Sequence, residues 1–172
     1  MKKIIVGICI MFFPILTFGD MTFPDSVSVV DVQTGFKIML GLTPRFVERE
    51  YAPSNEKRLL RRYSSGIEIW SVTYDDFRII YETFDMTINT IEIKTNRFRT
   101  SNGITIGDPL VNVIKAYGNP TDIQRGAQGE LFFVFRHDRF REINDYSEFT
   151  QIQFTIINNR VYRIFLSIRS WA

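Results

Sequence analysis

The stretch Gly103–Pro120 (GITIGDPLVNVIKAYGNP) constrains the fold more than any other part of the chain, because it marks both ends of one short helix. Asp108 followed by Pro109 predicts its start. A carboxylate can accept hydrogen bonds from N–H groups of the first turn. Proline suits the first helical position, because the N–H that it lacks would have no partner within the helix. Gly118 predicts its end, since glycine readily adopts the left-handed conformation that follows a helix. The apolar side chains between these ends form one stripe at helical spacing: Leu110, Val113, Ile114 and Tyr117. A helix this short is unstable alone, so the stripe must pack against another element.

A weaker copy of this stretch lies in residues 35–54, at an offset of 66 residues. Thr43 followed by Pro44 repeats the helix-start chemistry, shifted by one residue. Ala52 stands near the place of the terminal glycine, so the first helix is expected to end less sharply. The aligned pairs are Gly41 with Gly107, Thr43 with Pro109, Val47 with Val113 and Tyr51 with Tyr117.

Each predicted helix is followed by four segments with the pattern and turn residues of antiparallel strands. A further strand is expected before the first helix, at Ser26–Val32. The four segments are Arg58–Tyr63, Ile67–Tyr74, Phe77–Phe84 and Ile91–Phe98 in the first copy, and Thr121–Gly126, Glu130–Arg136, Phe149–Ile157 and Val161–Ile168 in the second.

These patterns predict an α+β fold of two tandem repeats, each a short helix packed on a four-stranded antiparallel sheet. The first repeat is assigned to residues 20–99 and the second to residues 100–172. A spacing near 66 residues lies outside solenoid periods, so we interpret it as the duplication of a small module. The alternative is a chance echo, because α/β proteins of ordinary composition share such features.

The last hairpin predicts which sheet face is buried. A two-residue turn at Asn158-Asn159 would pair Phe154 with Arg163 and mix polar and apolar residues on both faces. A three-residue turn pairs Phe154 with Ile164 instead, and we expect this register because burying each large apolar side chain is worth ~1.5–3 kcal/mol. The predicted apolar face carries Ile152, Phe154, Ile156, Tyr162, Ile164, Leu166 and Ile168, and the polar face carries Gln151, Gln153, Thr155, Arg163, Phe165, Ser167 and Arg169.

Residues 1–19 have the parts of a signal peptide: two lysines, an apolar run over Ile4–Phe18, and small residues before a cleavage point at Asp20. The apolar run is shorter than the ~20 residues of a spanning helix. We therefore expect cleavage and export to the periplasm or the medium, with a retained anchor as the alternative. The single cysteine, Cys9, lies inside this segment, so the mature protein would contain no disulfide.

Composition makes two classes of partner less expected, nucleic acid and anionic lipid. The chain has 21 basic residues, and without the two leader lysines 21 − 2 = 19 remain against 19 acidic ones. A mature protein of net charge near zero has little general attraction for nucleic acid or anionic lipid. The sixteen phenylalanines are enough to build a substantial core.

No pattern indicates catalysis. His137, the single histidine, is expected where a strand ends and a polar loop begins, and Asp75-Asp76 is typical of a turn. Nucleophile elbows, phosphate-binding glycine loops and His–Cys ligand spacings are absent from the sequence. We therefore expect no catalytic residue, no metal, no cofactor and a protein that is not an enzyme.

The motif Gly-Ile-Thr-Ile-Gly-Asp, a short helix and then Tyr-Gly-Asn-Pro resembles a motif of exported bacterial modules. The resemblance covers roughly Gly35–Ile168. It is similar to the tandem modules of β-lactamase inhibitory proteins and to small outer-membrane assembly lipoproteins of the SmpA/OmlA type. This resemblance implies a non-catalytic protein that grips another protein with an exposed sheet face.

The predicted polar face is the expected partner site. Phe165 stands alone there among polar neighbours and is the expected anchor, since aromatic and arginine side chains dominate binding hot spots. The candidate partner-binding residues are Gln153, Arg163, Phe165 and Arg169. Two alternatives stay open: a structural accessory of the bacterial cell envelope, and a small-molecule or glycan binder with a cleft between the repeats. The oligomeric state is left undetermined.

Two other features have structural interpretations. The basic run Lys57, Arg58, Arg61 and Arg62 could contact an acidic partner, but it is more typical of an exposed edge strand, where charge deters aggregation. Trp70 is expected in the core rather than as a binding anchor.

Overall fold

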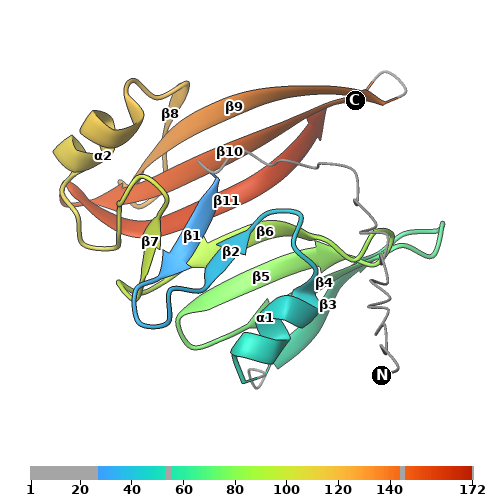
Figure 1. Cartoon of the computed structure of the whole chain (residues 1–172). Coiled ribbons are helices and arrows are strands. Elements are labelled where there is room, and N and C mark those ends of the chain that lie inside the picture. Colours follow the sequence, from blue (N-terminus) through green and yellow to red (C-terminus); the bar gives the residue numbers. More distant parts are fainter. Residues whose placement is uncertain (1–26, 53–55, 144–145, 172) are drawn as a thin grey trace, which may run out of the picture.

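The computed structural model describes residues 27–52, 56–143 and 146–171, with side chains for 27–52, 56–136 and 149–169 (Figure 1). The predicted leader, residues 1–19, lies outside the described residues. The described elements are β1 (Ser28–Asp31), β2 (Lys37–Met39), α1 (Pro44–Glu50), β3 (Glu56–Arg62), β4 (Glu68–Thr73), β5 (Phe77–Glu82), β6 (Ile88–Ile93), β7 (Phe98–Thr100), α2 (Leu110–Tyr117), β8 (Asp122–Arg125), β9 (Leu131–Ile143), β10 (Tyr146–Ile157) and β11 (Arg160–Trp171).

Eight of these strands form one antiparallel sheet in the order β3-β4-β5-β6-β11-β10-β9-β8. Strands β3–β6 follow α1 in the chain, and β8–β11 follow α2. The two groups join where β11 pairs with β6, with Ile164 opposite Ile93 and Leu166 opposite Ile91. A second sheet has three strands in the order β2-β1-β7 (Figure 1).

The structure confirms the α+β class, with two helices and antiparallel sheets in the described residues. The predicted architecture of two helix-plus-four-strand units does not match well, because all eight strands belong to one sheet; the sequence leaves open whether the two sheets are continuous. Both strands at the junction are apolar on one face, so their pairing removes two hydrophobic sheet edges. The three-stranded sheet was not predicted as such: the expected strand at Ser26–Val32 is its β1, but β2 and β7 have three residues each, too short to show alternation.

One face of the eight-stranded sheet is apolar across both groups of strands. A row of directly paired residues crosses six strands: Val72, Ile79, Ile91, Leu166, Ile152 and Phe135. Aromatic contacts place the other elements on this face: Tyr51 of the α1 end lies 5.0 Å from Phe77, Tyr117 of α2 lies 5.2 Å from Phe154, and Phe98 of β7 lies 5.1 Å from Phe77, centroid to centroid. Both helices and the small sheet therefore cover this apolar face, and we call the opposite side the open face.

Helix α2 begins one residue later than predicted, because Pro109 is its N-cap rather than its first helical residue, and the predicted Asp108 cap is absent. The Asp108 carboxylate accepts the Thr105 N–H at 2.9 Å and makes no cap hydrogen bond. The N–H of Leu110 donates instead to the carbonyl of Asn159 at 3.0 Å, so the β10–β11 turn occupies the helix start. The predicted end at Gly118 is confirmed, with φ of 77°. The local sequence therefore predicted where the helix lies, whereas the N–H of its first residue finds its hydrogen-bond acceptor in a residue distant in the chain.

The β10–β11 hairpin combines features of the two predicted alternatives: the turn length of one and the strand pairing of the other. Phe154 faces Ile164, as predicted, yet the turn has two residues, Asn158 and Asn159, both at positive φ. A β-bulge between Thr155 and Ile156 reconciles them, because Tyr162 is the extra residue on β11. The predicted burial of Tyr162 is wrong: it is 53% exposed, and Val161 takes its place at 2%.

An ionic network around the buried Asp31 connects the small sheet to the first group of strands. Arg97 donates to Asp31 of β1 at 2.7 Å and to Asp76 at 3.1 Å, and the Tyr51 hydroxyl donates to Asp31 at 2.9 Å. Burial alone would raise the pKa of Asp31, but the hydrogen bonds from Arg97, the Gln33 N–H and Tyr51 outweigh it and lower this pKa to about 2. Asp75-Asp76 lies between β4 and β5, as its turn interpretation predicted.

Candidate partner-binding face

The open face carries charged, amide and aromatic side chains in rows that cross the sheet. One row runs from edge to edge through directly paired residues: Glu56, Thr73, Arg78, Glu92, Phe165, Gln153, Val134 and Asp122. It passes through the β6–β11 junction, so side chains from both groups of strands meet on this face. The polar side of both groups is thereby assembled into one surface.

The structure places all four sequence-predicted site residues on the open face. Phe165 of β11 is paired directly with Gln153 of β10, and the guanidinium of Arg163 lies 5.8 Å from the Phe165 ring centroid. Arg169 lies four residues further along β11 and pairs with Phe149. Phe165 is half-buried rather than fully exposed. The candidates thus form two groups, one at the junction and one toward the β11 end.

A buried carboxylate organises the junction group. Glu92 of β6 is 3% exposed and forms ion pairs with two arginines, at 2.6 Å with Arg78 and 3.3 Å with Arg163. Because a buried charge is costly unless it is paired, Glu92 holds both guanidinium groups in place. Arg78 and Arg163 keep 34% and 41% of their side-chain surface accessible, so the ordered arginines still face outward.

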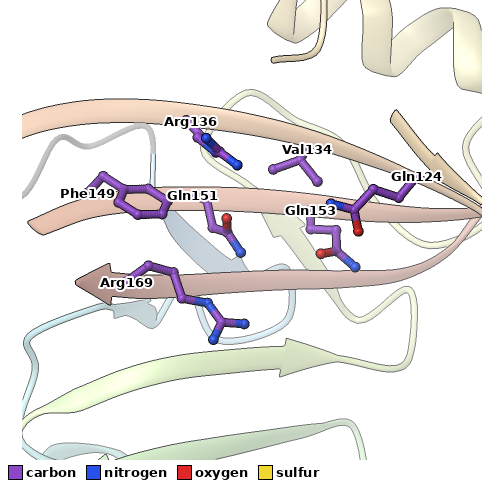
Figure 2. A pocket seen from close by; sticks show the side chains of 7 residues that line it. All are labelled: Gln124, Val134, Arg136, Phe149, Gln151, Gln153 and Arg169. Carbon is purple, nitrogen blue, oxygen red and sulfur yellow. The ribbon is translucent and has the colours of Figure 1, made fainter. Parts of the chain in front are cut away.

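The second group lines a pocket of about 320 Å3 on β8–β11 (Figure 2). Two apolar lining residues are buried, Val134 at 3% and Phe149 at 7% exposure. The Arg136 guanidinium lies 5.3 Å from the Phe149 ring centroid. The described lining residues are Gln124, Val134, Arg136, Phe149, Gln151, Gln153 and Arg169.

Sequence reasoning missed several residues of this face. Glu92 alternates with Ile91 and Ile93, which signals one polar side, but its place beside Phe165 depends on strand pairing distant in the sequence. Phe149 has the same parity as Gln151 and Gln153, so strand alternation alone could have assigned it to the polar face. No local pattern brings Arg78 and Arg163 onto one carboxylate.

The two structural interpretations from the sequence are confirmed. The basic residues Lys57, Arg58, Arg61 and Arg62 are exposed on β3, which is an edge strand. Trp70 is partly buried against the core, and its indole N–H donates to Glu68 at 2.9 Å. The basic run therefore lies at the opposite edge of the sheet from the pocket.

The described residues show no constellation for metal binding. No three His, Cys, Asp or Glu residues in the described part of the chain gather as metal ligands. The polar loop expected from His137 onward is wrong: β9 continues to Ile143, pairing with β10, and its side chains from His137 on lie outside those described. The segment contains no glycine or proline, so strand pairing can continue despite its polarity. Neither described helix is long and apolar enough to cross a membrane.

Comparison with known proteins found no match: no family model matches the chain, and no curated protein and no solved structure matches it significantly. The function is therefore argued from the geometry of the open face.

Proposed function

We propose that this protein is an exported, non-catalytic binding module that grips another protein with the open face of its eight-stranded sheet. The observation that carries this proposal is the cluster of Arg78, Arg163 and Phe165 around the buried Glu92. Export rests on the predicted leader, and the absence of catalysis rests on the missing sequence motifs.

The physical argument is preorganisation. Association loses free energy when flexible side chains become ordered, about 0.5–1.5 kcal/mol for each long one. Arg78 and Arg163 are already held by Glu92, and Arg163 also lies over the Phe165 ring. Arginine and aromatic side chains in such an arrangement are typical of binding hot spots.

We also propose that the two groups of strands, each with its preceding helix, arose by tandem duplication. In both groups, the loop before the helix makes the same pair of backbone hydrogen bonds with the last strand of the group, β6 or β11. In the first group the Gly41 N–H donates to Ile88 and the Ile88 N–H to Leu42; in the second the Gly107 N–H donates to Val161 and the Val161 N–H to Asp108, all at 2.8–2.9 Å.

Two further local features recur and support the duplication. A bulge follows Ile88 in β6 and Val161 in β11, leaving Asn89 and Tyr162 as the extra residues. The turn of the first hairpin in each group also has the same two backbone hydrogen bonds. The Tyr63 N–H donates to Ile67 and the Gly66 N–H to Tyr63, and the Gly126 N–H donates to Glu130 and the Gly129 N–H to Gly126. The repeated unit resembles the modules of β-lactamase inhibitory proteins, which supports a binding role without identifying the target.

Affinity capture tests the proposed function. The mature protein is used as bait in the periplasmic and secreted fractions of its source cell, alongside the variants Phe165→Ala and Val111→Ala. Val111 is 66% exposed on α2, on the covered side of the sheet. We expect Phe165→Ala to lose a captured protein that Val111→Ala retains, with both variants folded by thermal unfolding. Equal capture by both variants would contradict the proposal.

The pocket favours a second candidate, a small-molecule or glycan binder. Its volume of about 320 Å3 is at the lower end of ligand pockets, which span ~300–1,000 Å3. This candidate predicts a ligand that binds the isolated protein without any partner protein.

A further inference from the structure

The pocket on β8–β11 has a composition suited to one kind of group. Its described lining contains two arginines, three glutamines, a phenylalanine and a valine. Figure 2 shows these side chains on one side of the strands that carry them. The lining therefore offers positive charge and amide hydrogen bonds around an apolar base.

Each part of the lining matches a different part of an acidic amino acid within a polypeptide. A guanidinium group can donate two parallel hydrogen bonds to a carboxylate. The amides of Gln151 and Gln153 each offer donors and an acceptor, as a peptide backbone requires. The buried Phe149 and Val134 can contact the methylene groups of an acidic side chain.

The position of the pocket links it to the proposed binding face. Gln153 lines the pocket and is also the direct neighbour of Phe165 on β11. Gln124 is already engaged, since its amide donates to Asp122 at 2.6 Å. Arg169 is exposed at the pocket and is directly opposite Phe149. A partner resting on Phe165 could thus reach the pocket with one projecting side chain.

We propose that this pocket receives an aspartate or glutamate side chain from the partner protein, with Arg169 binding its carboxylate. This inference rests on the proposed function and names the chemistry of its partner. We expect this side chain to belong to a protein for two reasons. The amides of Gln151 and Gln153 match peptide groups, and Gln153 both lines the pocket and is paired with Phe165.

The test uses nuclear magnetic resonance on the isotope-labelled mature protein. The probes are N-acetyl-glutamate N-methylamide, its glutamine counterpart and glucuronate, each titrated to millimolar concentration. We expect the glutamate probe alone to produce saturable shifts in the side-chain amide signals of Gln151 and Gln153. Those shifts should be lost in Arg169→Gln and retained in Arg99→Gln, a matched change at an exposed arginine of β7.

Three outcomes would overturn the inference. Absence of saturable shifts would mean that the pocket binds no such side chain, and equal shifts with the glutamine probe would mean that it does not select a carboxylate. Stronger shifts with glucuronate would assign the pocket to an acidic glycan instead. None of these results depends on Phe165, so capture that is sensitive to Phe165→Ala would still support the proposed function after this inference had failed.

Discussion

The two groups of strands share their backbone turns but differ in how they use side chains. In the first group, Tyr51 at the end of α1 donates its hydroxyl to the buried Asp31, within an ionic network. In the second group, Tyr117 at the end of α2 packs against Phe135 and Phe154, and its hydroxyl is buried without a charged partner. Burial raises the pKa of Tyr117 to about 12, and Thr100 and the Asn102 backbone offset only part of that rise.

Strand length differs as well. Strands β4, β5 and β6 have six residues each, whereas β9, β10 and β11 have 13, 12 and 12. The longer strands supply the surface on which the pocket lies. The comparison teaches that two groups of strands with similar turns serve different roles: the first group anchors the small sheet through charge, and the second extends the open face.

Removal of Arg97 should give the largest effect, because it leaves the buried Asp31 without its guanidinium. Arg97→Ala is expected to lower the free energy of unfolding by about 3–5 kcal/mol. Urea denaturation measures this change, with Arg99→Ala on the exposed side of β7 as the control. A loss below about 1 kcal/mol would contradict an anchoring role for the network.

The two tyrosines offer a direct contrast between the groups. Tyr51→Phe removes a hydrogen bond to a charged acceptor and should cost about 1.5–3 kcal/mol of unfolding free energy. Tyr117→Phe removes a buried hydroxyl that has only neutral neighbours, Thr100 and the Asn102 backbone, so it should cost less, about 1 kcal/mol or below. Equal losses in the two variants, measured by urea denaturation, would show that the groups do not differ in this way.

The hairpin glycines should show the smallest effect and the closest agreement between the groups. Gly66 and Gly129 have φ of 85° and 88°, and a methyl group added to either would meet no atom within 4 Å. Each change to alanine should therefore cost about 1–2 kcal/mol from backbone strain alone. Losses that differ by more than about 1 kcal/mol would weaken the argument that the two turns are equivalent.

Local patterns in the sequence predicted a good part of this structure. Helix α2, the pairing of Phe154 with Ile164 and the β3–β4 hairpin follow from residue spacing and turn residues. The three-stranded sheet and the β6–β11 junction do not, because short strands and pairings distant in sequence leave no periodic signal. The candidate site divides in the same way: alternation placed Gln153, Arg163, Phe165 and Arg169 on one face, but it could not reveal the carboxylate of Glu92 that pairs with Arg163 beside Phe165.

The central claim is that the open face contacts a protein partner, and site-specific photo-cross-linking tests it most directly. A photo-cross-linking residue replaces Phe165 in one variant and Val111 in another, and each is expressed in the source cell and irradiated. The account predicts a discrete cross-linked partner at position 165 and none at position 111. A partner cross-linked at position 111, with none at position 165, would contradict it.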